Sequence, residues 1–344
     1  GAEAGDGSVG SHHDEVQLAS LRTWEQDFSR RPRHVYVMLA RCYAQTELYR
    51  LTGEEGLLHM SQFMRNELLK KGDGGMLVTG SCSDGEQFTY DQNGRGRIGE
   101  SCVTAYVLRW IDSLMRLEGD MRYGDLLERT IYNALMAANS PDGRWIRYFI
   151  PFAGDRQYDT RDSFCCCGNY RRMVAELPQK IYYRTPESGI AVNLFTNLEK
   201  AFDVKGRTVT ILQETAYPNH GNVKLTFSAK NPVAFPFQFR TPRWCEEITL
   251  RVNDEAPVVI DPLERRLGCF VLSRTWQDGD VVHISMPMAW RLLRGRAVQD
   301  GRVALLRGPI VYCVGKDQNA ELLAKCPEAR KLVIDPASIA EPTS

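Results

Sequence analysis

The spacing of hydrophobic residues changes near Gly189, and this change constrains the fold more than any other feature of the sequence. Before Gly189, apolar residues recur about every 3.6 positions, which predicts amphipathic helices. The pattern is clear between His34 and Arg50 and again between Glu54 and Lys70. After Gly189, apolar and polar residues alternate, which predicts half-buried strands. Helices followed by strands indicate an α+β chain with two segregated units.

Turn-forming residues divide the chain further. We expect a disordered end over residues 1–14, a helical unit over 15–185, a β-sandwich over 186–330 and a frayed tail over 331–344. Further helices are predicted at 101–117, 122–138 and 169–184. Strands are predicted near 190–194, 209–211, 223–227, 235–239, 247–253, 268–274, 280–286 and 302–313. Short strands separated by regular turns are typical of a sandwich. Residues 76–99, rich in Gly, Ser, Asp and Asn, predict a long functional loop.

Charge and hydropathy exclude two classes of partner. The chain has 43 Lys plus Arg and 43 Asp plus Glu, so its net charge favours neither nucleic acid nor an anionic membrane surface. No apolar run reaches the roughly 18–20 residues that span a bilayer. We therefore expect no nucleic acid and no membrane as partners.

The ten cysteines are too sparse for a disulfide scaffold. Three of them, Cys165, Cys166 and Cys167, are consecutive, and neighbouring cysteines do not easily bridge one another. Reduced thiols, some of them bound to a metal, fit this pattern better. We therefore expect a cytoplasmic protein.

Two short clusters at predicted helix starts carry metal-binding side chains. One is Gly99-Glu100-Ser101-Cys102, and the other is Cys165-Cys166-Cys167-Gly168-Asn169. Irregular backbone at a helix start lets a nearby carboxylate and thiols converge. One oxygen and three sulfur ligands suit tetrahedral Zn²⁺. The alternative is a reduced thiol cluster without metal, because the chain has no C-x-x-C pair.

A third feature is Glu86, in Gly85-Glu86-Gln87-Phe88 within the predicted loop. Taken alone, a Glu in a polar loop is most often a solvated surface residue. Its context indicates a functional role, because Glu86 belongs to a series of short motifs between about residues 30 and 315. In the helical half the series comprises Thr79-Gly80-Ser81, Gly85-Glu86-x-Phe88, Gly99-Glu100-x-Cys102, Leu127-Glu128-Arg129-Thr130-Ile131-Tyr132-Asn133, Asp142-Gly143, Tyr148 and Cys165-Cys166-Cys167-Gly168-Asn169. In the β half it comprises Thr241-Pro242-Arg243-Trp244, Val252-Asn253, Thr275-Trp276-x-Asp278-Gly279-Asp280, Arg307-Gly308-Pro309 and Tyr312.

The order and spacing of these motifs resemble the β-L-arabinofuranosidases of glycoside hydrolase family 127. The resemblance implies a zinc site whose ligands map to Glu100, Cys102, Cys165 and Cys166. Cys167 stands where the family commonly has proline, so the pair could instead be Cys166 and Cys167. Counting back from Asn169 favours Cys165.

The resemblance also implies a catalytic pair and substrate contacts. The nucleophile maps to Cys165 and the acid/base residue to Glu86. Substrate-contacting positions map to His34, Glu128 and Tyr148. The expected function is a retaining glycoside hydrolase that releases L-arabinofuranose, or a related sugar, from β-linked glycans. Zinc would make the thiol a thiolate, and Glu86 would protonate the departing oxygen.

The family's catalytic domain is an (α/α)6 barrel of twelve helices, which needs on the order of 250 residues or more. Residues 15–185 supply only part of such a barrel, so we expect a partial barrel followed by a β-sandwich. The missing helices could come from a homo-oligomer or from a partner chain. An alternative function is a non-catalytic carbohydrate-binding or assembly protein with a structural zinc site. A thiol redox function is less well supported, since no C-x-x-C motif is present.

Overall fold

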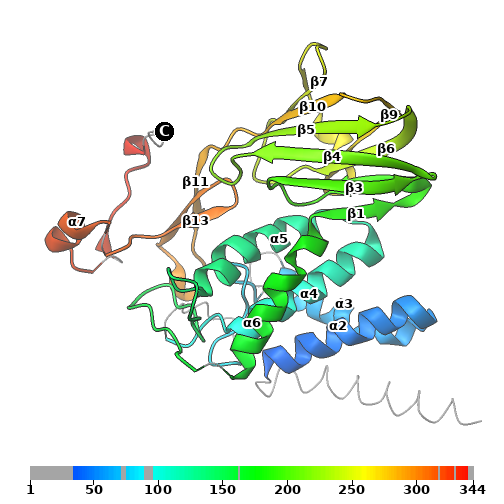
Figure 1. Cartoon of the computed structure of the whole chain (residues 1–344). Coiled ribbons are helices and arrows are strands. Elements are labelled where there is room, and N and C mark those ends of the chain that lie inside the picture. The colour runs from blue at the N-terminus through cyan, green and yellow to red at the C-terminus, as the bar shows by residue number, and fades with distance from the viewer. Residues whose placement is uncertain are drawn as a thin grey trace, which may run out of the picture.

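A computed structural model describes residues 34–70, 75–88, 96–161, 163–316, 318–328 and 331–339 (Figure 1). The expected disordered end over 1–14 lies outside these residues, as do residues 15–33 of the expected helical unit and 340–344 of the tail. Among the described helices, none is long and apolar enough to cross a membrane.

The first half of the described chain is helical. Its α-helices are α2 (Val35–Thr52), α3 (His59–Leu69), α4 (Ser101–Glu118), α5 (Tyr123–Thr130) and α6 (Cys165–Glu176). Short helical turns adjoin them: η1 (Glu55–Leu58), η2 (Ile131–Leu135), η3 (Met136–Ala138) and η4 (Leu177–Lys180). Gly53 and Gly119 end α2 and α4 in the left-handed conformation, which glycine adopts without strain. These helices bury one continuous apolar core.

Three predicted helices differ from the observed ones. The helix predicted over 54–70 begins as the tight turn η1 and becomes α-helical only at His59. The helix predicted over 122–138 is α-helical as far as Thr130 and then widens into the π-helical turn η2. The helix predicted over 169–184 is wrong at both ends, since α6 begins at Cys165 and Tyr182 already starts a strand.

The second half forms three sheets. A four-stranded sheet has the order β1 (Tyr182–Thr185), β2 (Gly189–Val192), β6 (Val233–Arg240) and β9 (Cys269–Trp276). A six-stranded antiparallel sheet has the order β3 (Leu198–Val204), β4 (Arg207–Thr215), β5 (Asn222–Ala229), β10 (Val281–Ser285), β7 (Thr249–Val252) and β8 (Val258–Val259). A three-stranded sheet joins β11 (Trp290–Arg294), β12 (Val303–Arg307) and β13 (Ile310–Tyr312). The short helix α7 (Ala320–Lys325) and the turns η5 (Pro186–Ser188), η6 (Pro262–Glu264), η7 (Arg266–Gly268), η8 (Ala297–Gln299) and η10 (Pro336–Ser338) complete the described elements.

The two larger sheets form a sandwich with its own core. Phe227 of β5 stacks on Trp276 of β9 at 3.9 Å between ring centroids and meets Phe237 of β6 edge-on. The prediction that residues 302–313 complete this sandwich is wrong. They form β12 and β13 of the smaller sheet, which lies beside the helices because Asn133 bonds to the backbone of Pro309 and Val311.

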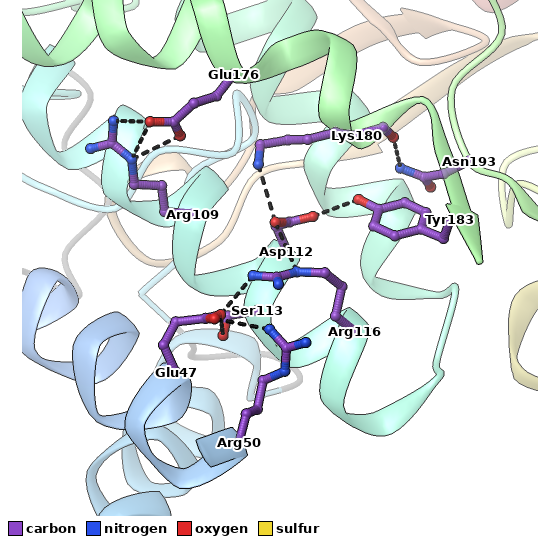
Figure 2. A network of polar contacts seen from close by, with 10 residues as sticks. All are labelled: Glu47, Arg50, Arg109, Asp112, Ser113, Arg116, Glu176, Lys180, Tyr183 and Asn193. Atoms are coloured by element: carbon purple, nitrogen blue, oxygen red, sulfur yellow. Dashed lines mark hydrogen bonds and ion pairs between the residues drawn. The ribbon is translucent and has the colours of Figure 1, made fainter. Parts of the chain in front are cut away.

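Helices α4 and α6 run side by side in the same direction. Near their starts, Asn169 contacts Cys102, and farther along Arg109, midway along α4, forms a bidentate pair with Glu176 at the end of α6. Figure 2 shows how a polar network continues this contact. There, the Asp112 carboxylate accepts hydrogen bonds from buried Lys180 at 3.1 Å and from Tyr183 at 2.5 Å. The network joins α4 to η4 and β1, and so holds α4 against the segment that follows α6.

Candidate functional site

The two predicted clusters meet because α4 and α6 start at the same place. Glu100 immediately precedes α4, and its backbone N–H donates to Ser83 Oγ at 3.1 Å. The Ser101 hydroxyl donates to the Arg147 carbonyl at 2.6 Å, which ties the start of α4 to the segment before Tyr148. Cys165 opens α6. The positive ends of two helix dipoles therefore lie at one point, an arrangement that favours thiolates and carboxylates.

Four potential ligand atoms gather at this point. One atom each from Glu100, Cys102, Cys165 and Cys166 lies within 4.8 Å of the other three. All but Cys165 are buried, so Cys165 is the thiol that faces solvent. Cys167 is buried outside this group. The geometry thus groups the pair Cys165 and Cys166, rather than Cys166 and Cys167, with the other two ligands.

The four side chains fit a divalent metal ion. Glu100 Oε2 is buried without a hydrogen-bond partner, while Oε1 accepts from the Cys166 thiol at 3.7 Å. A buried carboxylate oxygen without a partner is costly unless a cation neutralises it. Three sulfurs and one oxygen within reach of that cation are a tetrahedral donor set suited to zinc.

The thiols and the carboxyl at this point have perturbed acidities. Burial raises the pKa of the Glu100 carboxyl to about 8. Hydrogen bonds, first from Cys166 and then from Asn169, lower the pKa of Cys102 to about 6. Burial, together with the nearby Cys102, raises the pKa of Cys165. Of the two thiols, Cys102 is therefore the more readily deprotonated, and Cys165 needs a bound cation to become a thiolate at neutral pH.

Glu86 lies beside this group and is held from three sides. The Tyr148 hydroxyl donates to Glu86 Oε1 at 2.5 Å, and His34 Nε2 lies 3.7 Å from Oε2. The Val35 N–H donates to the Glu86 carbonyl at 2.9 Å. Glu86 also has a φ of 67°, a conformation that non-glycine residues adopt at a cost in energy and that is common at functional sites. Glu86 is therefore an oriented side chain and not a freely solvated one.

Tyr148 connects Glu86 to the thiol group. Its hydroxyl lies 2.5 Å from Glu86 Oε1 and 3.9 Å from Cys165 Sγ. Phe164, the residue before α6, stacks on the Tyr148 ring with an interplanar angle of 12°. Burial raises the pKa of Tyr148, so the hydroxyl stays protonated and able to donate.

Glu128 has contacts of a different kind. It is buried in α5, pairs with Arg240 of β6 and accepts a hydrogen bond from Tyr217 at 2.6 Å. Trp244 also donates to it, at 3.4 Å. The structure therefore ties Glu128 to the sandwich and does not bring it to Glu86, whereas His34 and Tyr148 do lie there.

Sequence reasoning gave no role to Asn169 or Phe164. Asn169 donates to Cys102 Sγ at 3.1 Å, and it is held in turn by Arg172. Its spacing is a usable signal, because residues four apart in a helix share a face and Asn169 follows Cys165 by four. Phe164 offers no such signal, since its partner Tyr148 comes from a separate loop.

Comparison with known proteins finds one family. Residues 12–179 match the family model described as beta-L-arabinofuranosidase, GH127 catalytic domain, and residues 189–288 match the model of the GH127 middle domain. A curated relative, the non-reducing end beta-L-arabinofuranosidase of Bifidobacterium longum subsp. longum, is 26% identical over 81% of this chain and 45% of its own length.

Solved structures agree with this result. A GH127 beta-L-arabinofuranosidase from Geobacillus stearothermophilus T6 is 28% identical with a TM-score of 0.72, over 83% of this chain and 48% of that chain. Another GH127 beta-arabinofuranosidase is 25% identical with a TM-score of 0.74, over the same shares of the two chains. The chain thus spans about half the length of the relatives it matches.

Proposed function

Because this chain belongs to glycoside hydrolase family 127, we propose that it is a retaining glycosidase that releases L-arabinofuranose, or a related sugar, from β-linked glycans. One observation carries the proposal. The Tyr148 hydroxyl lies within reach of both an oriented carboxyl, Glu86, and an exposed thiol, Cys165. Retaining glycosidases need an acid/base group and a nucleophile at a short separation, about 5–5.5 Å between two carboxyls.

Glu100, Cys102, Cys165 and Cys166 would hold the proposed zinc ion. When bound, zinc supplies the positive charge that keeps Cys165 ionised and later makes it a better leaving group. Only Cys165 among the four is exposed, so only this thiol can reach a sugar. Cys166 and Cys102 are buried and serve to hold the metal.

The reaction then follows from the exposed Cys165 thiol and the half-buried Glu86 carboxyl. Cys165 Sγ attacks the anomeric carbon while Glu86, initially protonated, donates its proton to the departing glycosidic oxygen. Glu86 next takes a proton from water, and that water displaces Cys165 from the same carbon. Two inversions give net retention. His34 and Tyr148 orient Glu86 and face the sugar, and a substrate contact by Glu128 stays a prediction.

The expectations about the complete barrel, the bounds of the two units and the source of further helices are also proposals. We propose that the helices belong to an (α/α)6 barrel that other helices complete, that residues 15–185 are the catalytic unit, and that the sandwich lies within residues 186–330. Those helices would come from a homo-oligomer, a partner chain or a longer form of this protein. A cytoplasmic location stays a prediction.

The test is the rate and stereochemistry of hydrolysis by this chain. Cys165→Ser should abolish turnover, whereas Cys313→Ser, at an exposed cysteine outside the thiol group, should leave it unchanged. NMR of the first-formed anomer should show retention. An inverted product, or a fully active Cys165→Ser variant, would remove the cysteine nucleophile from the mechanism.

The alternative is a non-catalytic carbohydrate-binding or assembly protein with a structural zinc site, a function to which the β-sandwich half is suited. Glu86→Gln separates the two functions. In a glycosidase it should lower the rate about 10²–10⁴-fold for substrates with poor leaving groups, and much less for activated aryl glycosides. A zinc-loaded chain that binds sugar but hydrolyses neither substrate would support the alternative.

A further inference from the structure

A second polar group lies on the other side of the segment that carries Tyr148. Ile146 pairs with Asp159 in an antiparallel bridge, and the Asp159 N–H donates to the Ile146 carbonyl at 2.8 Å. This register sets Arg147 opposite Tyr158. Successive side chains of an extended segment alternate in direction, so Arg147 points away from the side to which Tyr148 points. Arg156, two residues before Tyr158, lies close enough to Arg147 for the two charges to interact.

Arg147 is a buried cation. The residue is 6% exposed, and its Nε is buried with no hydrogen-bond partner. No ion pair engages its guanidinium within the part of the chain that the structure describes. The Tyr158 hydroxyl is likewise buried without a partner. Arg147 Nε and the Tyr158 hydroxyl, on residues that the register sets opposite each other, are thus both buried without a hydrogen-bond partner.

The acids nearest along the chain are already engaged. Asp155 pairs with Lys316, and Asp159 forms a bidentate pair with Arg161. Asp142 accepts a hydrogen bond from Ser140 at 2.5 Å. None of these carboxylates contacts Arg147. Among the described residues, the acids nearest along the chain therefore do not neutralise Arg147.

The electrostatic surroundings make an anion favourable here. Burial lowers the pKa of Arg147, and the nearby Arg156 lowers it further, while Tyr158 and Cys313 act in the opposite direction. A guanidinium nevertheless remains charged in proteins. Burying such a charge unpaired, with a second guanidinium close by, is costly, and a bound anion removes most of that cost.

We propose that Arg147, Arg156 and Tyr158 form a binding site for the carboxylate of an acidic sugar residue. A guanidinium fork matches a planar carboxylate with two parallel hydrogen bonds, and the Tyr158 hydroxyl supplies a third donor. The sugar part of the assignment rests on the proposed glycosidase function. The Arg147 carbonyl accepts from Ser101 at the start of α4, so the site is anchored to the same helix as the thiol group.

The test is direct binding of D-galacturonate, with neutral D-galactose and inorganic phosphate as comparison probes, by calorimetry. Galacturonate should bind and galactose should not. Arg147→Met should weaken galacturonate binding on the order of tenfold to a hundredfold, since it removes a charged hydrogen-bond pair. Tyr158→Phe should weaken it less. The matched control is Arg144→Met, an exposed arginine of the same loop, which should leave binding unchanged.

Two further measurements separate a loss of galacturonate binding from a loss of folding and from a failure of the proposed catalysis. In buffer without galacturonate, Arg147→Met should unfold at the same temperature as the parent or higher, because it removes an unpaired buried charge. Cys165→Ser should bind galacturonate like the parent, so failure of the proposed catalysis would not affect this result. Absence of galacturonate binding, binding that persists in Arg147→Met, or binding of phosphate alone would each overturn the proposal.

Discussion

At the scale of single residues, the side chains of this site depend on one another for their orientation. Glu86 adopts a strained backbone conformation, and Tyr148, His34 and the Val35 N–H hold it in place. Tyr148 is itself positioned by stacking on Phe164, the residue before the helix that presents the thiols. The proposed acid/base residue and nucleophile are thus coupled through one tyrosine.

Removing the Tyr148 hydroxyl should therefore affect turnover more than substrate binding. We expect Tyr148→Phe to lower kcat on the order of tenfold to a hundredfold with little change in KM, because Glu86 loses the donor that orients it. Initial rates over a range of substrate concentrations measure both constants. The control is Tyr49→Phe, at a tyrosine on α2 away from the site. An equal loss in the two variants would contradict the positioning role.

The metal ligands give a second prediction at this scale. Protein purified with reductant should contain close to one zinc ion per chain, and the double change Cys102→Ser, Cys166→Ser should remove it. Serine binds zinc poorly because its hydroxyl is not ionised near neutral pH. Elemental analysis measures the occupancy, with Cys313→Ser as the control. Full zinc occupancy in the double variant would show that the metal, if present, binds elsewhere.

At the scale of elements, the parallel packing of α4 and α6 creates the site, and the polar network beyond it maintains that packing (Figure 2). Its most buried charged member is Lys180, whose ammonium pairs with Asp112. A buried ion pair adds little net stability but becomes costly when one partner is removed.

Asp112→Asn should accordingly destabilise the protein by about 3–5 kcal/mol, since it leaves Lys180 buried and uncompensated. Urea unfolding measures the change. The additional change Lys180→Met should recover much of the loss. The control Asp155→Asn, which breaks a fully exposed pair with Lys316, should have no measurable effect. A similarly small effect of Asp112→Asn would show that the network does not maintain the packing.

At the scale of the whole molecule, helices and sandwich are joined at α5. The Arg240 side chain is fully buried between the two halves, where it pairs with Glu128 and with Asp125 at 2.7 Å and donates to the Asn193 carbonyl. Gly124 lets the backbone of α5 approach this contact closely. A Cβ added there would lie 2.1 Å from Asn193 Oδ1 and 2.4 Å from Arg240 Cδ.

Gly124→Ala should therefore destabilise the protein by about 1–3 kcal/mol, although alanine normally favours a helix. The matched control is Gly168→Ala in α6, where a Cβ meets nothing within 4 Å, and where alanine should stabilise by up to about 1 kcal/mol. Thermal unfolding of both variants compares them. Stabilisation by both changes would mean that the halves do not pack as closely as the structure shows.

The order of helices and strands could be predicted from the sequence, because each segment's backbone preference depends on residues close together in the chain. The change of period near Gly189 reports the backbone preference of each segment and its buried face, so the order of helices and strands and most strand positions were predicted correctly. The helix start beside Glu100 follows from local signals as well, whereas the second helix begins at Cys165, four residues before the predicted start at Asn169. To group the four candidate ligands, the order of the motifs was needed as well. Hydrophobic periodicity does not connect the cluster at Glu100 with the cluster at Cys165.

Tertiary structure decided the rest, because the residues that meet are far apart in the chain. Tyr148 contacts Glu86 across 62 positions, and Arg240 contacts Glu128 across 112. Glu128 could be recognised by its motif, but only the packed structure shows that its carboxylate pairs with Arg240 between the helices and the sandwich. Residues 302–313 read as strands from their pattern, yet that pattern cannot specify which sheet they join. Hydrophobic periodicity determines which face of a segment is buried, whereas the partner that buries it depends on the packing of the whole chain.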